Sequence, residues 1–196
     1  MMKQAFKALV MSGILAVITT STQTVRAAER GEGADARQAQ VKMSFSGSMI
    51  PTAIGVQPDT ITDEELLAGS GSFGQFTFRA LRTDEMSPIG FGSCGDGFGP
   101  SIRVVAGGGV FRFEDGSLVM VNLTDGVLCI DFDHLVGHLT ETYQITGGTG
   151  RFKSASGTLQ VTKRLKPVMV SPAGQAVLLT ITGELKGTIR GSSEKG

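Results

Sequence analysis

A glycine-dense turn between two alternating segments constrains what this chain can fold into more than any other feature. The turn, Gly147-Gly148-Thr149-Gly150, holds three glycines in four residues, which implies backbone positions with φ > 0 or with no room for a Cβ. The flanking segments alternate with the period of a β-strand. No phosphate-loop pattern accompanies the glycines, and no helical periodicity follows them. Residues 140–163 are therefore predicted to be a β-hairpin with an elaborate turn.

The rest of the chain supports an all-β fold. Glycine supplies 28 of 196 residues, about twice its usual share, and turn signals separate short alternating runs. In the last run, Gly183 and Gly187 share a face with apolar residues, which suits the curvature of a barrel. We expect a single eight-stranded antiparallel barrel. Its further strands are expected at 41–49, 72–81, 110–113, 117–123, 127–132 and 177–189, and residues 102–105 are expected to start a strand.

Two segments break the strand pattern. Thr62 and Glu65 form a capping-box pattern, which predicts a short helical turn from Thr62 to Leu67. Residues 83–100 carry glycines at nearly regular spacing and are predicted to be a long loop.

The N-terminus has the pattern of a secretory signal peptide. Lys3 and Lys7 precede an apolar run over 8–20, and Ala27 ends a small-residue cleavage region. We predict a signal peptide over 1–27, a disordered leader over 28–40, a barrel domain over 41–191 and a flexible tail over 192–196. The protein is expected to be secreted or periplasmic, and a membrane anchor is disfavoured because the apolar run is too short.

The net charge and the aromatic content disfavour several classes of binding partner. Cleavage after Ala27 removes three basic residues and no acid from a balance of 18 against 18, which leaves a mildly acidic protein. Such a charge argues against nucleic acid, and no later segment is apolar enough for membrane insertion. The chain has no Trp and a single Tyr, which disfavours sugars. We expect no cofactor, and a homo-oligomer remains open.

Cys94 and Cys129 are the only cysteines. An even count in an exported chain favours one disulfide, which would pin the glycine-rich loop to the neighbouring strands. Two reduced thiols or one reactive thiol are the alternatives.

The two histidines lie in a short acidic segment. Two carboxylates and two imidazoles within eight residues have the chemistry of a divalent metal site. A strand followed by a turn would not align them on one face, so we expect a solvated turn and no metal. The residues concerned are Asp131, Asp133, His134 and His138.

Glu141 and Tyr143 are the polar members of a face otherwise formed by Leu139 and Ile145. If that face points inward, a carboxylate and a phenol enter an apolar barrel, and burial would raise the pKa of the carboxylate. Glu141 is more simply expected near the rim, in water. Tyr143 and Glu141 are the candidate ligand-binding residues, and Glu141 is a weak candidate for catalysis.

The hairpin resembles that of the allene oxide cyclase and dirigent-like β-barrels, and is closest to their small secreted bacterial members. Ser70–Gln75 also resembles an upstream segment of these proteins, and the resemblance covers roughly residues 42–190. It implies an eight-stranded antiparallel barrel and, by analogy, an isomerase or cyclase activity, although the catalytic residues of the family have no recognisable match here. The residues that carry it are Gly147, Gly148, Thr149, Gly150, Arg151, Phe152, Ala155 and Gly157.

Three functions follow from these observations. We rank first a secreted barrel that binds a small, largely apolar molecule in its interior. The second is an isomerase or cyclase, as the resemblance implies. The third is a structural or self-associating barrel without a ligand. Several polar groups converging inside the barrel would favour an enzyme, and a dry, filled interior would favour the structural role.

Overall fold

The structure is a computed structural model that describes residues 38–52, 54 and 56–192. The predicted signal peptide, residues 28–37 of the predicted leader and residues 193–196 of the predicted tail lie outside the described residues. Within the described part, no helix is long and apolar enough to cross a membrane. Its elements are β1 (Gln38–Pro51), β2 (Thr60–Gly71), β3 (Gly74–Glu85), β4 (Gly90–Cys94), β5 (Gly97–Phe113), β6 (Leu118–Asp131), β7 (Val136–Gly148), the 3-10 helix η1 (Gly150–Phe152), β8 (Ser156–Val170) and β9 (Ala176–Arg190).

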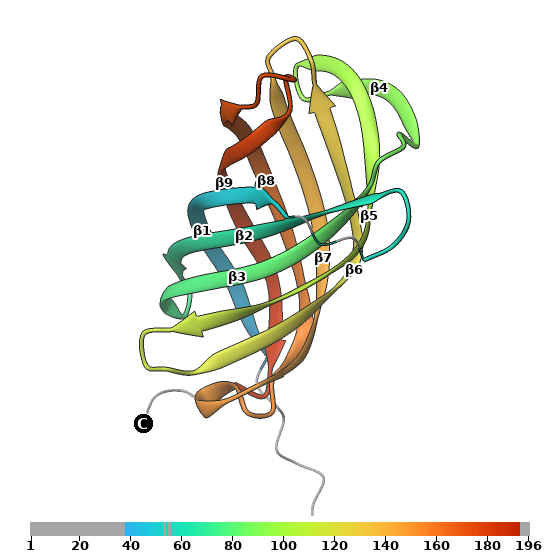
Figure 1. Cartoon of the computed structure of the whole chain (residues 1–196). Coiled ribbons are helices and arrows are strands. Elements are labelled where there is room, and N and C mark those ends of the chain that lie inside the picture. Colours follow the sequence, from blue (N-terminus) through green and yellow to red (C-terminus); the bar gives the residue numbers. More distant parts are fainter. Residues whose placement is uncertain (1–37, 53, 55, 193–196) are drawn as a thin grey trace, which may run out of the picture. The chain divides into compact units, whose positions relative to one another are not determined.

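Eight of these strands close into an antiparallel barrel, as the sequence predicted. The strands follow the order β3-β2-β1-β9-β8-β7-β6-β5, and pairing of β3 with β5 closes the ring. β4 is an additional strand that pairs with β5 outside this ring. Figure 1 shows β4 at the upper end of the barrel and the connection between β7 and β8 at the opposite end.

The predicted hairpin is formed by β7, η1 and β8, with Ile145 opposite Gly157. Phe152 is fully buried at this end of the barrel, and Arg151 stacks over its ring with the guanidinium carbon 4.9 Å from the ring centroid. Arg151 also donates a 2.6 Å hydrogen bond to the Phe73 carbonyl oxygen and pairs with Asp115 at 3.3 Å. The hairpin therefore closes one end of the barrel by packing and by charge.

Two predicted breaks in the strand pattern are wrong. The segment 62–67 lies in β2 and not in a helical turn, because its residues pair with β1 and β3 along their whole length. The predicted loop over 83–100 contains the end of β3, all of β4 and the start of β5. The glycines misled the prediction, since here Gly97 and Gly99 let the start of β5 pack closely against Asp131 and Ile130.

Two boundaries also differ from the prediction. β6 runs without interruption through Thr124–Gly126, so the segments 117–123 and 127–132, expected as two strands, are one strand. The pairing register with β7 shifts between Leu123 and Asp125, as at a β-bulge. β1 begins at Gln38, inside the segment predicted as a disordered leader.

The barrel interior has an aromatic half next to η1. Phenylalanine rings from β3, β5, η1 and the β2–β3 turn contact one another there. Phe78 and Phe111 are stacked with ring centroids 4.1 Å apart, and Phe113 and Phe152 are tilted with centroids 4.8 Å apart. Phe73 meets Phe152 edge-on at 5.3 Å. Burial of these rings is a large part of the apolar driving force, roughly 25 cal/mol per Å² of apolar surface.

The turn glycines yield a stability prediction. Gly150 has φ +57, and a Cβ on Gly148 would overlap the carbonyl oxygens of Phe152 and Leu118. We expect Gly150→Val to cost roughly 1–3 kcal/mol through backbone strain, and Gly148→Val to cost at least as much through the clash. Gly90→Ala is the control, because a Cβ on Gly90 has no atom within 4 Å. Urea melts measure all three variants, and unchanged midpoints for both valine variants would contradict the prediction.

Candidate functional site

The most unusual feature of the interior is a layer of buried charged side chains, which we call the ionic layer. It lies beyond the aromatic half and is built from inward-facing positions of β2, β3, β7 and β8. Every member is at most 4% exposed. Because isolated buried charges are costly, such a layer is expected only where the charges are paired. Its members are Asp63, Glu65, Arg82, Asp84, Glu141 and Lys163.

Arg82 is the centre of the layer on the side of β2 and β3. Its guanidinium forms a bidentate pair with Asp84, with Nη2 2.7 Å from Oδ2 and Nε 3.0 Å from Oδ1. Nη2 also donates to Asp63 Oδ2 at 2.9 Å, and Nη1 to Glu65 Oε1 at 3.2 Å. Burial opposes the charged guanidinium, but the surrounding carboxylates, Asp84 first, hold the pKa of Arg82 above its ordinary value.

Lys163 extends the layer across the barrel to β7 and β8. Its Nζ donates to Glu65 Oε2 at 2.5 Å and lies 2.6 Å from Glu141 Oε2, where the geometry is that of an ion pair and not of a hydrogen bond. Glu65 therefore bridges the two cations. Burial raises the pKa of Glu65, but Lys163 and Arg82 outweigh burial and bring it below its ordinary value.

The layer holds four carboxyl groups and two cations, so full ionisation would leave excess negative charge in the interior. Burial raises the pKa of Asp63 to about 6, with the neighbouring Asp84 and Glu65 acting in the same direction against Arg82. Burial likewise raises the pKa of Glu141. Protons on these two carboxyls would bring the layer to neutrality.

Tyr143 lies between the ionic layer and the aromatic half. It is 1% exposed, and its ring meets Phe78 edge-on at 6.2 Å. Its hydroxyl interacts with the Glu141 carboxyl group, which also pairs with Lys163, although neither contact has the geometry of a regular hydrogen bond. Burial raises the pKa of Tyr143 well above 10.0, and the Glu141 carboxylate adds to the shift. Glu141 is thus buried, contrary to the expectation that it lies near the rim in water.

Little free space remains between these side chains. The void at the junction of the aromatic half and the ionic layer has a volume of about 10 Å³. That is close to the minimum for one water molecule and far below the roughly 300–1,000 Å³ of ligand sites. The void is lined by Phe45, Leu67, Phe76, Phe78, Phe111, Val161, Lys163 and Leu185.

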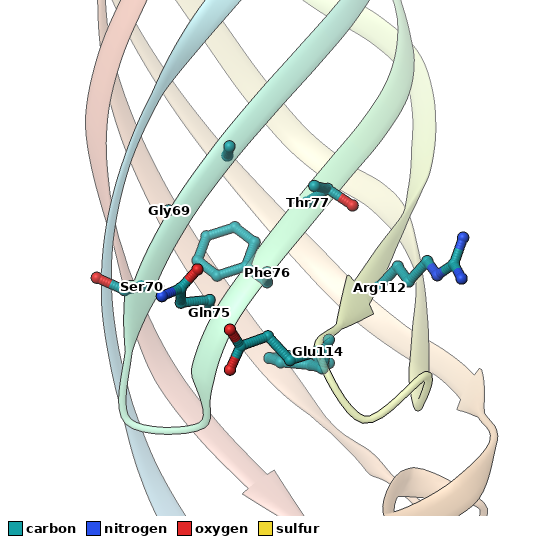
Figure 2. A pocket seen from close by; sticks show the side chains of 9 residues that line it. Gly69, Ser70, Gln75, Phe76, Thr77, Arg112 and Glu114 are labelled. Carbon is teal, nitrogen blue, oxygen red and sulfur yellow. The ribbon is translucent and has the colours of Figure 1, made fainter.

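Larger hollows lie on the outer wall. One of about 650 Å³ lies near the β2–β3 and β5–β6 hairpins. Figure 2 shows the polar side chains of Gln75, Arg112 and Glu114 around it. An adjoining hollow of about 510 Å³ is more apolar, with Leu66 and Val110 in its lining. Leu66 is 49% exposed and Val110 39% exposed, so this wall offers apolar surface to solvent.

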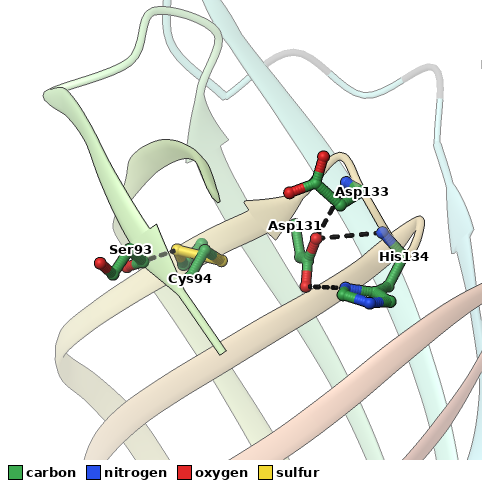
Figure 3. Close-up of a disulfide and its surroundings, with 6 residues drawn as sticks. Ser93, Cys94, Asp131, Asp133 and His134 are labelled. Carbon is green, nitrogen blue, oxygen red and sulfur yellow. Dashed lines mark hydrogen bonds and ion pairs between the residues drawn. A yellow bond between two sulfur atoms is a disulfide. The ribbon is translucent and has the colours of Figure 1, made fainter. Parts of the chain in front are cut away.

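The predicted disulfide between Cys94 and Cys129 is confirmed, with a Cα–Cα distance of 5.7 Å. Figure 3 shows that it ties the end of β4 to β6. Gly97 and Gly99 lie against Asp131 and Ile130, where a Cβ on either glycine would overlap them. The bridge therefore fixes the glycine-rich segment to the neighbouring strands, as expected.

The four residues considered for a metal site do not form one cluster. Asp131 caps the β6–β7 turn, because its carboxylate accepts hydrogen bonds from the backbone N–H groups of Asp133 and His134 and lies 2.8 Å from His134 Nδ1 (Figure 3). His138 lies on β7 opposite Cys129, beside Gly95. No group of three or more potential ligands in residues 38–52, 54 and 56–192 has a metal-binding arrangement.

Comparisons with known proteins give only a distant likeness. No protein-family model matches the chain, and no curated protein matches it in sequence. Among solved structures it is similar to the pterocarpan synthase dirigent protein PsPTS1, at 14% identity and a TM-score of 0.45 over 81% of this chain and 97% of that chain. A second, GePTS1, gives 13% identity and a TM-score of 0.44 over 82% and 88%. At these values we transfer no residue role from either protein.

The sequence pointed to Tyr143 and to Glu141, one member of the ionic layer, but the other five members were missed. A signal was present, because each missed residue continues an inward-facing series of a strand. Arg82 and Asp84 follow Phe78 and Ala80 on β3, and Lys163 lies between Val161 and Leu165 on β8. The capping-box interpretation of 62–67 concealed the same alternation in β2.

Replacement of Arg82, the central cation, tests how much the ionic layer stabilises the fold. We expect Arg82→Met to destabilise the protein by about 3–5 kcal/mol, because three buried carboxylates lose their shared partner. Arg79→Met is the matched control: Arg79 pairs with Glu64 at 2.6 Å, but its side chain is 75% exposed. An exposed pair of this kind contributes about 1 kcal/mol or less. Equal losses in urea melts of the two variants would contradict the role assigned to Arg82.

The raised pKa of Asp63 predicts a pH dependence. Between pH 3.8 and about 6 the folded protein retains a proton that the unfolded chain has released, so the folded state binds more protons. The unfolding free energy of wild type, measured relative to that of Asp63→Asn, should therefore fall as the pH rises through this window and level off above it. Denaturation at a series of pH values measures this difference. A difference that rises with pH would show that the pair with Arg82 outweighs burial.

Proposed function

We propose that this protein is a packed structural or assembly barrel that works through its outer surface in an oxidising compartment. The observation that carries the proposal is the filled interior, where the void beside Lys163 has about 10 Å³. A carrier or cyclase of the kind ranked first and second from the sequence needs an interior site some tens of times larger. The third function therefore has the better support.

The outer wall supplies the surface that such a role needs. Leu66, Val110 and Met120, on β2, β5 and β6, are between 39% and 49% exposed. Val110 and Met120 are directly opposite each other in the sheet. Arg79 lies between Leu66 and Val110 in the sheet, so the wall combines apolar and basic side chains. Exposed apolar side chains bordered by polar ones are typical of interaction sites.

The compartment is part of the proposal. Disulfides persist in oxidising environments and are rare in the cytosol of most organisms. The Cys94–Cys129 bridge therefore supports export to the periplasm or the medium, in line with the signal peptide predicted over 1–27.

A second function has one observation in its favour. The Tyr143 hydroxyl and the Glu141 carboxyl group lie together at the boundary between the apolar and charged halves of the barrel, and the contact between them is not a regular hydrogen bond. A small, largely apolar molecule with one polar group would satisfy them if the barrel expanded to admit it. A cyclase that uses Glu141 as an acid or base requires the same expansion.

A ligand screen separates the two functions. Thermal-shift and native mass spectrometry measurements would use fatty acids, oxylipins and small phenolics on wild type and Tyr143→Phe. The filled interior predicts no saturable shift in melting temperature with any of these compounds. A shift that saturates in wild type and weakens in Tyr143→Phe would overturn the proposal and support the interior site.

A further inference from the structure

β4 differs from the other strands in having an open edge. The eight barrel strands each have at least two strand neighbours, because β3 and β5 close the ring. Within the described part of the chain, β4 pairs with β5 alone. In Figure 1 it lies at the upper end of the barrel, outside the ring. An open strand edge presents backbone N–H and C=O groups that can pair with another strand.

The backbone groups that face outward follow from the pairing register. Phe91 is opposite Pro100, which has no N–H. These two residues therefore form a non-hydrogen-bonded pair of the antiparallel ladder. Because pair types alternate along an antiparallel ladder, Phe91 and Ser93 direct their N–H and C=O groups away from β5, and Gly92 directs its groups toward β5. The Ser93 carbonyl oxygen lies 3.9 Å from Cys129 Sγ, which has no hydrogen to donate as half of a disulfide (Figure 3).

The edge lacks the charged residues and the proline that often protect such strands. Gly90–Cys94 contains no charged residue and no proline. Phe91 is 66% exposed and Phe98, which is opposite Ser93, is 57% exposed, so the same face carries two exposed aromatic side chains. The disulfide holds the end of the strand in place, so no ordering of a loose loop would be needed on pairing.

We propose that β4 pairs in antiparallel orientation with β4 of a second copy of this chain, about a two-fold axis at Gly92. This inference rests on the proposed outer-surface role and names its partner. In this register Phe91 and the partner's Ser93 form a hydrogen-bonded pair, in which each N–H donates to the other residue's C=O. The two-fold axis generates the same two hydrogen bonds between Ser93 and the partner's Phe91. Gly92 faces the partner's Gly92 at a Cα separation of about 4.5 Å.

Self-complementarity favours a second copy over a foreign strand. The pairing places the large Phe91 side chain beside the small side chain of the partner's Ser93, on the face that already carries Phe98. On the opposite face of β4, Gly90 and Gly92 have open space, since a Cβ on either has no atom within 4 Å. A second β4 therefore offers the backbone donors and acceptors that the first one needs, and its side chains are complementary in size. The strand carries no charge that would favour an oppositely charged partner.

Ser93→Pro tests the pairing directly. Proline removes an outward N–H and leaves the hydrogen bonds to β5 intact, and Ser93→Ala is the control that keeps the N–H. In sedimentation velocity over a wide concentration range, wild type and Ser93→Ala should reach the mass of two chains, and Ser93→Pro should remain at the mass of one. Wild type that stays monomeric, or a dimer that a folded Ser93→Pro variant retains, would overturn the inference.

A cross-linking pair tests the register and does not depend on the proline variant folding. Gly92→Cys should form an intermolecular disulfide on mild oxidation, because the two substituted residues face each other across the axis. Phe98→Cys, which is also exposed, should not, because Phe98 lies on β5, one strand further from the axis. Cross-linking of both variants alike, or of neither, would overturn the β4 register. Either result leaves the outer-surface function intact, because only the ligand screen with Tyr143→Phe decides that.

Discussion

The arrangement of the barrel interior depends on the burial of Arg82. A guanidinium removed from water must keep its donors occupied, and here Asp63, Glu65 and Asp84 accept its hydrogen bonds from adjacent positions of β2 and β3. Glu65 in turn needs a second cation, which Lys163 supplies from the far side of the barrel. Strands distant in sequence are therefore joined by charge as well as by backbone pairing.

This constraint divides the interior into two parts with different roles. The aromatic half near η1 contributes buried apolar surface. The ionic layer fixes the pairing register of the strands, because a shift by one residue would turn its charged side chains to the outer face. Tyr143 and Glu141 lie where the two parts meet, and the space between them is filled. A barrel packed in this way has its accessible chemistry on the outside, in the wall around Leu66 and in the edge of β4.

The sequence was sufficient for the all-β barrel, the hairpin at Gly147–Phe152 and the disulfide, because alternation, turn glycines and an even cysteine count are local signals. It was insufficient for the ionic layer. Whether Glu65 or Lys163 points inward depends on pairing partners about a hundred residues away, and a charged residue taken alone favours solvent. The glycines of 90–99 were ambiguous for a related reason, since glycine marks loops as well as strands packed closely on a neighbour.

The most direct test of the filled interior uses Tyr143, the only tyrosine in a chain without tryptophan. Its ionisation can be followed by ultraviolet absorbance during an alkaline titration, with circular dichroism recorded in parallel to report the fold. The account predicts that the phenol stays neutral as the pH passes 10.0 and ionises only when the barrel unfolds. Ionisation near pH 10.0 with the fold intact would show that water reaches the interior and would contradict the account.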